Sequence, residues 1–352
     1  MTLWSIFLPL DRHFLLFKGK SSSLVENGVP KVIGISACAF FLQFIFIYLF
    51  AGLTKNDSTW AMNGTAVYSS LNLGAFAKPL GVSISRNHEL TRFLTSVTTV
   101  AEMLMPFLLL LDTKRVSLRL LAVGFFVAMQ VGFFATLEVG IFPFAMIAYT
   151  LAFLPSCFWE KYVRCNDYSQ KEDRKVGKTE KSALRNLIVS MLLLLSTFDV
   201  IGSSFKSKYT TLPNWLQETV YSVRVDQRWW MFVVSEWRDF WIDVEAIQGD
   251  GGVIDVWSWQ RGATDLSFSK ERPNDIRDVF SEQPWNNYIH QLKDNALLRE
   301  WFLFNLCHKY NLANPANKIR ELKLHYSYRT ILGIDEFTPV SHEVIAEWKC
   351  ES

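Results

Sequence analysis

Several signatures of soluble enzymes are missing from this sequence. Its five cysteines include no CxxC pair of the kind that marks a zinc or redox site, and no group of ligand-type residues has metal-binding spacing. It also has no glycine-rich phosphate loop, no dinucleotide fingerprint and no Ser-His-Asp spacing that stands out. The usual signs of a metalloenzyme, a nucleotide-binding enzyme or a serine hydrolase are therefore absent.

A strong charge of one sign is lacking as well. The formal net charge of +2 over 352 residues gives no indication of nucleic-acid binding. The opening stretch, residues 1–17, has no basic region before its apolar residues, and Asp11, Arg12 and His13 interrupt it. It therefore does not resemble a secretory signal peptide. We expect no nucleic acid among the partners of this chain.

Long hydrophobic runs are abundant. Half of the residues are hydrophobic and 15% are aromatic, which is more than a soluble protein of this size usually has. About 20 mainly apolar residues are needed to cross a bilayer. Five segments qualify, and they predict a multi-pass α-helical bundle in residues 1–205: 33–53, 91–111, 116–136, 138–157 and 185–205.

Loop charges predict how these spans are oriented. Lysine and arginine are concentrated before the first span, after the second and after the fourth. By the positive-inside rule these loops face the cytoplasm. The stretch 54–90, whose part 61–90 we interpret as interfacial or re-entrant, then lies outside, together with the turn at Glu138 and residues 206–352. We expect a protein of the cell membrane, the bacterial inner membrane, in contact with the lipid bilayer.

Residues 206–352 predict a small extracytoplasmic α+β domain that is rich in tryptophan. Residues 240–247 and 253–257 alternate around a Gly-Asp-Gly-Gly turn, which indicates a β-hairpin. Residues 285–310 have helical spacing, and 322–329 alternate like a half-buried strand. Cys307 and Cys350 both fall in this domain, so a disulfide between them is plausible in an oxidising compartment.

Lys55 is the first residue that could carry chemistry. It follows the first apolar run directly, in Ala-Gly-Leu-Thr-Lys. A lysine there can simply anchor the span at the lipid headgroups. Alternatively, a lysine partly removed from water beside apolar helices can act as a general base.

Other polar residues lie in or beside the spans. Glu102 is in the middle of the second span, where a carboxylate costs about 3 kcal/mol and needs a partner or a wet cavity. Gln130, in the third span, can hydrogen-bond between helices or face the same site as Lys55. His88 and Arg92, near the external start of the second span, can face the same site or form a polar interfacial rim. The simplest interpretation is that Glu138 is solvated and that Asp199 snorkels to the interface.

Taken in order, several short motifs resemble the HTTM family, which includes vitamin K-dependent gamma-carboxylase. The central one is Tyr-Leu-Phe-Ala-Gly-Leu-Thr-Lys at 48–55, followed by Trp60, Gly64, Thr65, Ala66 and Tyr68. Others are at 7–14, at Glu102 and Pro106, and at 140–144, 153–155, 228–232 and 250–255. The resemblance implies that Lys55 deprotonates reduced vitamin K or another quinone. Oxygenation of that anion then yields the strong base that removes a proton from a substrate glutamate.

The sequence departs from the family pattern at three places. Gln130 stands where the family commonly has a histidine, and glutamine cannot carry a proton in catalysis. The spacing from Trp60 to Gly64 is one residue longer than in the carboxylase. Typical members also have further hydrophobic helices before the motif at 7–14, which this sequence lacks; we expect a misplaced start codon, a truncated relative, or a separate polypeptide that supplies those helices.

Two hypotheses from different classes follow. The chain is a carboxylase-like or other quinone-linked membrane enzyme with Lys55 as the base, and with Glu102 and Gln130 as further site residues. Alternatively, it is a non-catalytic membrane factor for the maturation or assembly of a secreted peptide or protein. A transporter has little support, because the five segments show no internal repeat.

Overall fold

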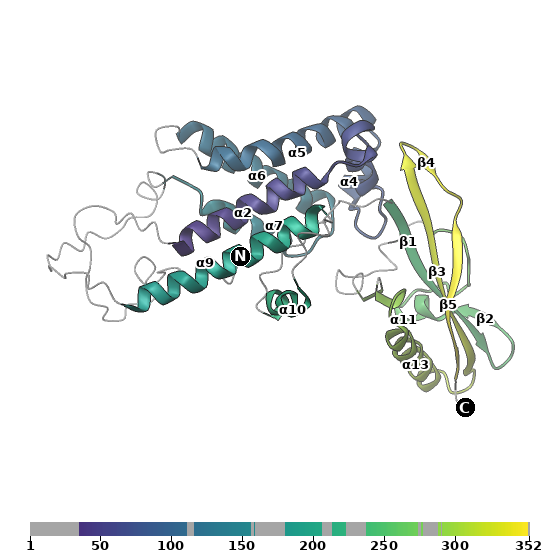
Figure 1. Cartoon of the computed structure of the whole chain (residues 1–352). Coiled ribbons are helices and arrows are strands. Elements are labelled where there is room, and N and C mark those ends of the chain that lie inside the picture. The colour runs from purple at the N-terminus through teal and green to yellow at the C-terminus, as the bar shows by residue number, and fades with distance from the viewer. Residues whose placement is uncertain are drawn as a thin grey trace, which may run out of the picture. The chain divides into compact units, whose positions relative to one another are not determined.

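The computed structural model describes residues 35–110, 116–155, 158, 180–205, 213–222, 237–273, 276, 288–289 and 291–350. Within 180–205, side chains are described for residues 186–202. Within these ranges, helices occupy the part up to residue 222, and a sheet with helices α11 and α13 follows (Figure 1). The predicted motifs at 7–14 and 228–232, and the cysteines 157 and 165, lie outside the described residues.

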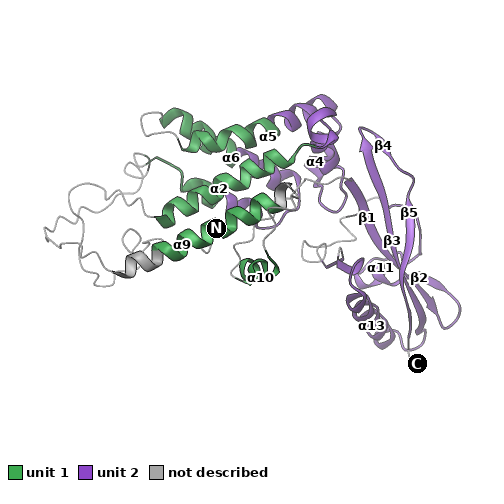
Figure 2. Cartoon of the chain, in the orientation of Figure 1, with its two compact units in different colours: residues 1–56, 98–127, 148–233 green, residues 57–97, 128–147, 234–352 purple. Residues whose placement is uncertain are grey.

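The chain divides into two compact units, drawn in different colours in Figure 2. The first consists of residues 1–56, 98–127 and 148–233, and the second of residues 57–97, 128–147 and 234–352. The boundary between them falls within α5 (His88–Leu109), α6 (Val116–Thr136) and α7 (Phe142–Leu151). Each of these helices therefore contributes residues to both units.

In the first unit, α2 (Ile35–Thr54) packs against α9 (Glu180–Phe205), and α10 (Asn214–Ser222) joins them. Ala39 and Phe40 of α2 form a small core with Val189 of α9 and Val220 of α10. Because α2 is apolar around its whole circumference, neighbouring helices cover much of it, and ten of its side chains are buried.

Three of the described helices are long and apolar enough to cross a membrane: α2, α5 and α6. They coincide with the first three predicted spans. The predicted fourth span is shorter than the sequence indicated, because α7 is only ten residues and rises about 15 Å. It begins after Gly140, which has a positive φ of 59°, and ends at Leu151. In α9 the apolar part is Asn186–Gly202, so five spans remain a prediction.

The second unit contains a five-stranded antiparallel sheet in the order β2-β1-β3-β4, with β5 also pairing with β3. Its strands are β1 (Trp237–Gln248), β2 (Val253–Asp255), β3 (Ile319–Gly333), β4 (Glu336–Phe337) and β5 (Ser341–Lys349). The predicted hairpin is confirmed, since β1 pairs with β2. It is shorter than predicted, because Asp255 accepts a hydrogen bond from the Trp257 amide and starts α11 (Val256–Gln260) instead.

Alternation along β1 and β3 separates two faces of the sheet. Phe240, Ile242 and Val244 of β1 join Leu322 and Leu324 of β3 in the main core. Helix α13 (Ala296–Ala313) covers this face with five buried side chains, Phe302, Leu303, Leu306, Cys307 and Tyr310. The predicted helix over 285–310 is interrupted, because residues 293–295 form a turn and Asn295 caps α13 through the Leu298 amide.

Three short helices lie before α5, in the stretch that we interpret as interfacial or re-entrant. They are η2 (Ser58–Met62), α3 (Ala66–Leu71) and α4 (Pro79–Ser85). Asp57 starts η2 by accepting hydrogen bonds from the amides of Thr59 and Trp60 at 2.9 and 3.0 Å. These helices belong to the second unit.

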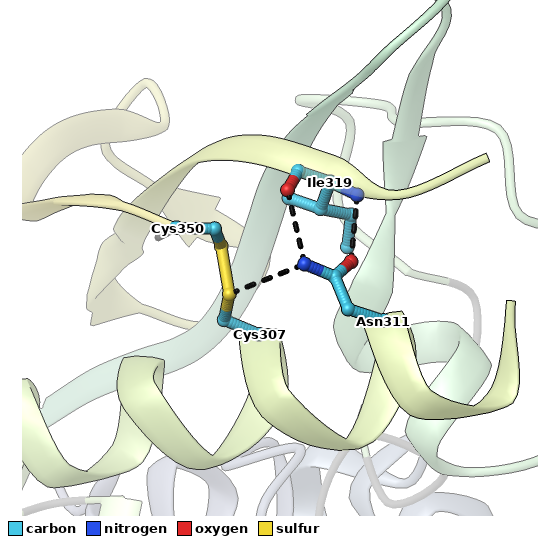
Figure 3. Close-up of a disulfide and its surroundings, with 4 residues drawn as sticks. All are labelled: Cys307, Asn311, Ile319 and Cys350. Atoms are coloured by element: carbon cyan, nitrogen blue, oxygen red, sulfur yellow. Dashed lines mark hydrogen bonds between the residues drawn. A yellow bond between two sulfur atoms is a disulfide. The ribbon is translucent and has the colours of Figure 1, made fainter. Parts of the chain in front are cut away.

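A disulfide joins Cys307 of α13 to Cys350, which follows β5, with the two Cα atoms 6.0 Å apart (Figure 3). Asn311, one turn after Cys307, holds the start of β3. Its side chain accepts from the Ile319 amide at 2.7 Å and donates to the Ile319 carbonyl at 3.2 Å. The disulfide therefore closes a loop of 43 residues around an already ordered helix–strand junction.

Substituting Cys350→Ser is expected to destabilise the second unit by about 2–4 kcal/mol, because the unfolded chain regains the freedom of that loop. Thermal unfolding of the detergent-solubilised full chain, with and without a reductant, measures the effect. Cys38→Ser removes a free cysteine in α2 and is the matched control. An unfolding temperature that did not change in Cys350→Ser would contradict a stabilising disulfide.

Candidate active site

Lys55 and Glu102 meet in the first unit. Lys55 follows the last residue of α2, and Glu102 lies in α5. The Lys55 Nζ donates a hydrogen bond to Glu102 Oε2 and forms an ion pair with it. Both residues are almost completely buried, with 5% and 4% of their surface exposed. The structure thus joins two residues that the sequence had identified separately.

Gly52 explains how α2 and α5 come close enough for this contact. A Cβ atom at this position would lie 2.8 Å from the Met103 Cγ and 3.3 Å from the Met103 backbone nitrogen. Gly52 is three residues before Lys55, and Met103 is the neighbour of Glu102. The glycine therefore permits the close helix packing that brings the ammonium group to the carboxylate.

Aromatic rings lie along one face of α2. Phe44 and Tyr48 are one turn apart and share a face of α2, and Lys55 follows the last residue of this helix. The Tyr48 ring centroid is 4.2 Å from that of Phe126, and the Phe44 centroid is 4.7 Å from that of Phe153. All four rings are buried. The middle of α2 therefore packs in apolar, aromatic surroundings within the first unit.

The pairing decides the cost of burying these charges. A single charged side chain in the middle of a span costs about 3 kcal/mol. The ion pair is neutral as a whole, and its hydrogen bond satisfies one donor and one acceptor, so it is cheaper to bury than either charge alone. The same hydrogen bond offers a direct path for a proton between an amine and a carboxylate. This arrangement is suited to general acid–base chemistry.

The other residues named from the sequence have different positions. Gln130 is fully buried in the part of α6 that belongs to the second unit. His88 and Arg92, near the start of α5, contact carboxylates: His88 Nε2 is 3.4 Å from Asp335 Oδ2, and Arg92 is 3.3 Å from Glu89. Glu138 pairs with Lys78 at 3.3 Å, and Asp199 is buried in α9.

A second buried carboxylate, Asp239 of β1, was not identified from the sequence. Its Oδ2 accepts hydrogen bonds from Arg272 at 2.9 Å and Arg329 at 3.1 Å, and its Oδ1 accepts from the Gly74 amide at 2.8 Å. Its side chain is fully buried. Burial and the neighbouring charge of Arg272 lower the pKa of Arg329, and Asp239 opposes this shift. The cluster anchors the turn at Gly74 to the sheet.

Other polar groups share this face of the sheet. His325 Nε2 is 2.8 Å from Glu245 Oε2, and the Phe268 ring lies over the imidazole with centroids 5.1 Å apart. Burial, together with the nearby charge of Asp255, raises the pKa of Asp243 to about 7. Within the described ranges, no group of three or more histidine, cysteine, aspartate or glutamate side chains is arranged to hold a metal ion.

Three apolar helices of spanning length and a buried ion pair between two of them define a multi-pass membrane protein. This part of the chain is an HTTM domain: the family model described as HTTM domain matches residues 20–158. The matched region contains both Lys55 and Glu102. It relates the chain to the family of the vitamin K-dependent carboxylase. Comparison with curated proteins and with solved structures gives no match.

Proposed function

We propose that this protein is a membrane enzyme with carboxylase-like or other quinone-linked chemistry, in which Lys55 is the general base. The observation that carries the proposal is the buried contact of the Lys55 amine with Glu102 inside the HTTM domain. An amine in water remains protonated at neutral pH, whereas an amine in contact with a buried carboxylate has a group to which its proton can pass. Glu102 is the positioning partner and proton acceptor of Lys55.

The surroundings of the pair fit a reduced quinone. The buried rings of Phe44, Tyr48, Phe126 and Phe153 pack together in the same unit as the pair and would suit a flat apolar ring. A reduced quinone, such as reduced vitamin K, would supply an acidic hydroxyl and an oxidisable ring. With its own proton held by Glu102, the Lys55 Nζ would accept the hydroxyl proton and become an ammonium group beside the neutral Glu102 side chain.

The proposed location is the bacterial inner membrane, with residues 206–352 on the extracytoplasmic side. The lysine- and arginine-rich loops support this orientation, since such loops stay in the cytoplasm. The Cys307–Cys350 pair is also typical of an oxidising compartment. A glutamate-containing secreted peptide is the proposed substrate if the reaction is a carboxylation.

The full chain, reconstituted in lipid nanodiscs with a reduced naphthoquinone, is expected to consume oxygen faster than empty nanodiscs. Addition of a glutamate-rich peptide and labelled bicarbonate then distinguishes carboxylation, which incorporates label, from quinol oxidation alone. Several reduced quinones should be compared, including benzoquinone types. Oxygen uptake equal to that of empty nanodiscs with all of them would refute the enzymatic proposal.

One observation favours the second hypothesis, a non-catalytic maturation or assembly factor. Lys55 already has a carboxylate partner in the structure, and such a pair can serve helix packing alone. Gln130, which stands in place of a histidine, also favours the non-catalytic hypothesis, because glutamine cannot carry a proton in catalysis. Under this hypothesis the pair can be replaced by apolar residues without loss of function.

A further inference from the structure

Two buried carboxylates lie near each other on the polar face of the sheet, which is the face opposite α13. Asp243 of β1 and Asp255 at the end of β2 have 8% and 5% of their surface exposed. Asp255 is the cross-strand partner of Glu245, and its Oδ1 accepts a hydrogen bond from the Val244 amide at 3.1 Å. Two ionised carboxylates in such a place repel each other and lack water, so a proton on one of them is favoured.

Hydrogen bonds decide which of the two carboxylates takes the proton. Asp255 accepts from two backbone amides, each at 3.1 Å, and from the Ser258 hydroxyl at 2.5 Å. These donors stabilise its ionised form. For Asp243, burial and the charge of Asp255 raise the pKa to about 7, against the smaller opposing effects of Arg261 and the Trp241 indole. Asp243 is therefore the group that changes its charge near neutral pH.

The other charged groups of this face are engaged with partners of their own. His325 of β3 stands opposite Asp243, but its Nε2 contacts Glu245 Oε2 at 2.8 Å. Further partnered groups along the same face are Lys323 with Glu321, and Asp239 with Arg272 and Arg329. Arg261, which follows α11, acts on Asp243 through its charge. That single charge cannot neutralise two carboxylates, so ionisation of both leaves an excess of negative charge on this face.

Residues 261–273 run across the polar face, and we call this segment the cover. The Leu266 carbonyl accepts a hydrogen bond from the Asp255 amide at 2.8 Å, and the Phe268 ring lies over His325 with centroids 5.1 Å apart. Two further attachments are the bridge of Ser267 with Ile254 and the hydrogen bond of Arg272 to Asp239. Within the cover there is no helix and no strand longer than this bridge. Its local opening therefore breaks few backbone hydrogen bonds.

We propose that the cover is pH-sensitive: it closes over the polar face when Asp243 carries a proton and opens when Asp243 is ionised. Ionisation places a second negative charge near Asp255 where the closed cover excludes water, and opening lets water solvate both carboxylates. Asp243 binds its proton more tightly in the closed form than in the open form. The closed form is therefore favoured as the pH falls and is lost as the pH rises through the raised pKa of Asp243. The proposal is independent of the proposed enzymatic function.

Hydrogen exchange of the full chain in lipid nanodiscs tests the proposal, with each rate corrected for the pH dependence of intrinsic exchange. The Asp255 amide reports opening, because its acceptor is a carbonyl of the cover. For an open form in which Asp243 regains its ordinary pKa, linkage predicts an opening constant about tenfold larger at about pH 8 than at about pH 6. Amides of α13, on the other face of the sheet, should be equally protected at both pH values.

Asp243→Asn, which has nearly the same shape and no charge, should abolish the pH dependence and keep the cover closed at both pH values. Asp265→Asn is the matched control. The Ser267 amide donates to Asp265 and lowers its pKa, so this exposed carboxylate of the cover is ionised throughout, and its loss should leave the tenfold difference intact. If Asp243→Asn does not fold, Asp243→Ser, which is also uncharged, takes its place.

Three results would overturn the proposal. The first is equal protection of the Asp255 amide at both pH values in the parent chain. The second is a difference that persists in Asp243→Asn and disappears in His325→Gln, because the imidazole would then be the sensor. The third is an equal change in protection throughout the second unit, including α13, because the pH would then act on the whole fold and not on the cover.

Discussion

Lys55→Met is expected to lower quinol-dependent turnover by about 10²–10⁴-fold, the usual contribution of a general base. Methionine keeps most of the length of the side chain but has no amine to accept a proton. Oxygen uptake by the reconstituted chain, measured at saturating quinol, gives the effect on the turnover number. The Michaelis constant for the quinol should change much less, because the substitution leaves the buried aromatic rings of the same unit unaltered.

A loss of folding would mimic this result, because Lys55→Met leaves the Glu102 carboxylate buried without its partner. Removing one member of a buried pair costs about 3–5 kcal/mol, whereas replacing both by apolar residues is often neutral. The double variant Lys55→Met/Glu102→Leu should therefore recover stability, measured by thermal unfolding, and still be inactive. Full turnover in this double variant would establish the pair as structural and favour the non-catalytic hypothesis.

Lys78→Met is the matched control. Lys78 also pairs with a glutamate, Glu138, at 3.3 Å, but the two side chains are 24% and 47% exposed, against 3% and 6% in the Lys55 pair. An exposed ion pair contributes about 0–1 kcal/mol. We therefore expect little change in either stability or turnover. A loss of turnover in Lys78→Met as large as that in Lys55→Met would show that the assay reports membrane insertion and not chemistry at Lys55.

Composition and periodicity were sufficient to find the apolar helices and the residues of the pair. Glu102 stood out because a carboxylate in a span requires a partner, but the partner itself could not be derived from the sequence. That depends on the crossing of α2 and α5, which Gly52 permits through its contact with Met103. A glycine in an apolar run has many possible reasons, so its role became evident only with the packing.

The length of α7 shows a different limit of predicting helices from hydropathy. The run 138–157 is apolar enough to predict a span, yet the helix occupies only Phe142–Leu151. Hydropathy measures transfer to lipid and does not register where the backbone leaves the helical region, as it does at Gly140. The turn at 293–295 shortened the predicted helix in the C-terminal domain for a similar reason, since Asn295 starts α13 there.

The Asp239 cluster could not be predicted from the sequence because it depends on strand register. Asp239 and Arg329 are 90 residues apart and become cross-strand partners only when β1 and β3 pair in the observed register. A slip of one residue would turn Arg329 to the other face of the sheet. The alternation of β3 predicted a strand, but it carried no information about which strand would lie beside it.

Asp239→Asn is expected to destabilise the second unit by about 3–5 kcal/mol. The asparagine has nearly the same shape, but it cannot neutralise Arg272 and Arg329, whose guanidinium groups both donate to one oxygen of Asp239. Urea unfolding of the solubilised full chain measures the loss. The buried indoles of Trp237 and Trp241, on the same strand, report it by fluorescence. Asp265→Asn, at an exposed turn, should change stability by less than about 1 kcal/mol.

A second substitution separates lost charge from lost packing. If the unpaired arginines cause the instability, Arg272→Met in the Asp239→Asn background should recover part of it, because one of two mutually repelling charges is gone. If the instability instead came from misfitting of the amide against Gly74, the added substitution would make it worse. The space there is tight, since a Cβ on Gly74 would lie 2.7 Å from Ile276 and 3.0 Å from Asp239 Oδ1. Additive destabilisation would therefore reject an electrostatic anchor and leave steric fit as the property that holds the Gly74 turn to the sheet.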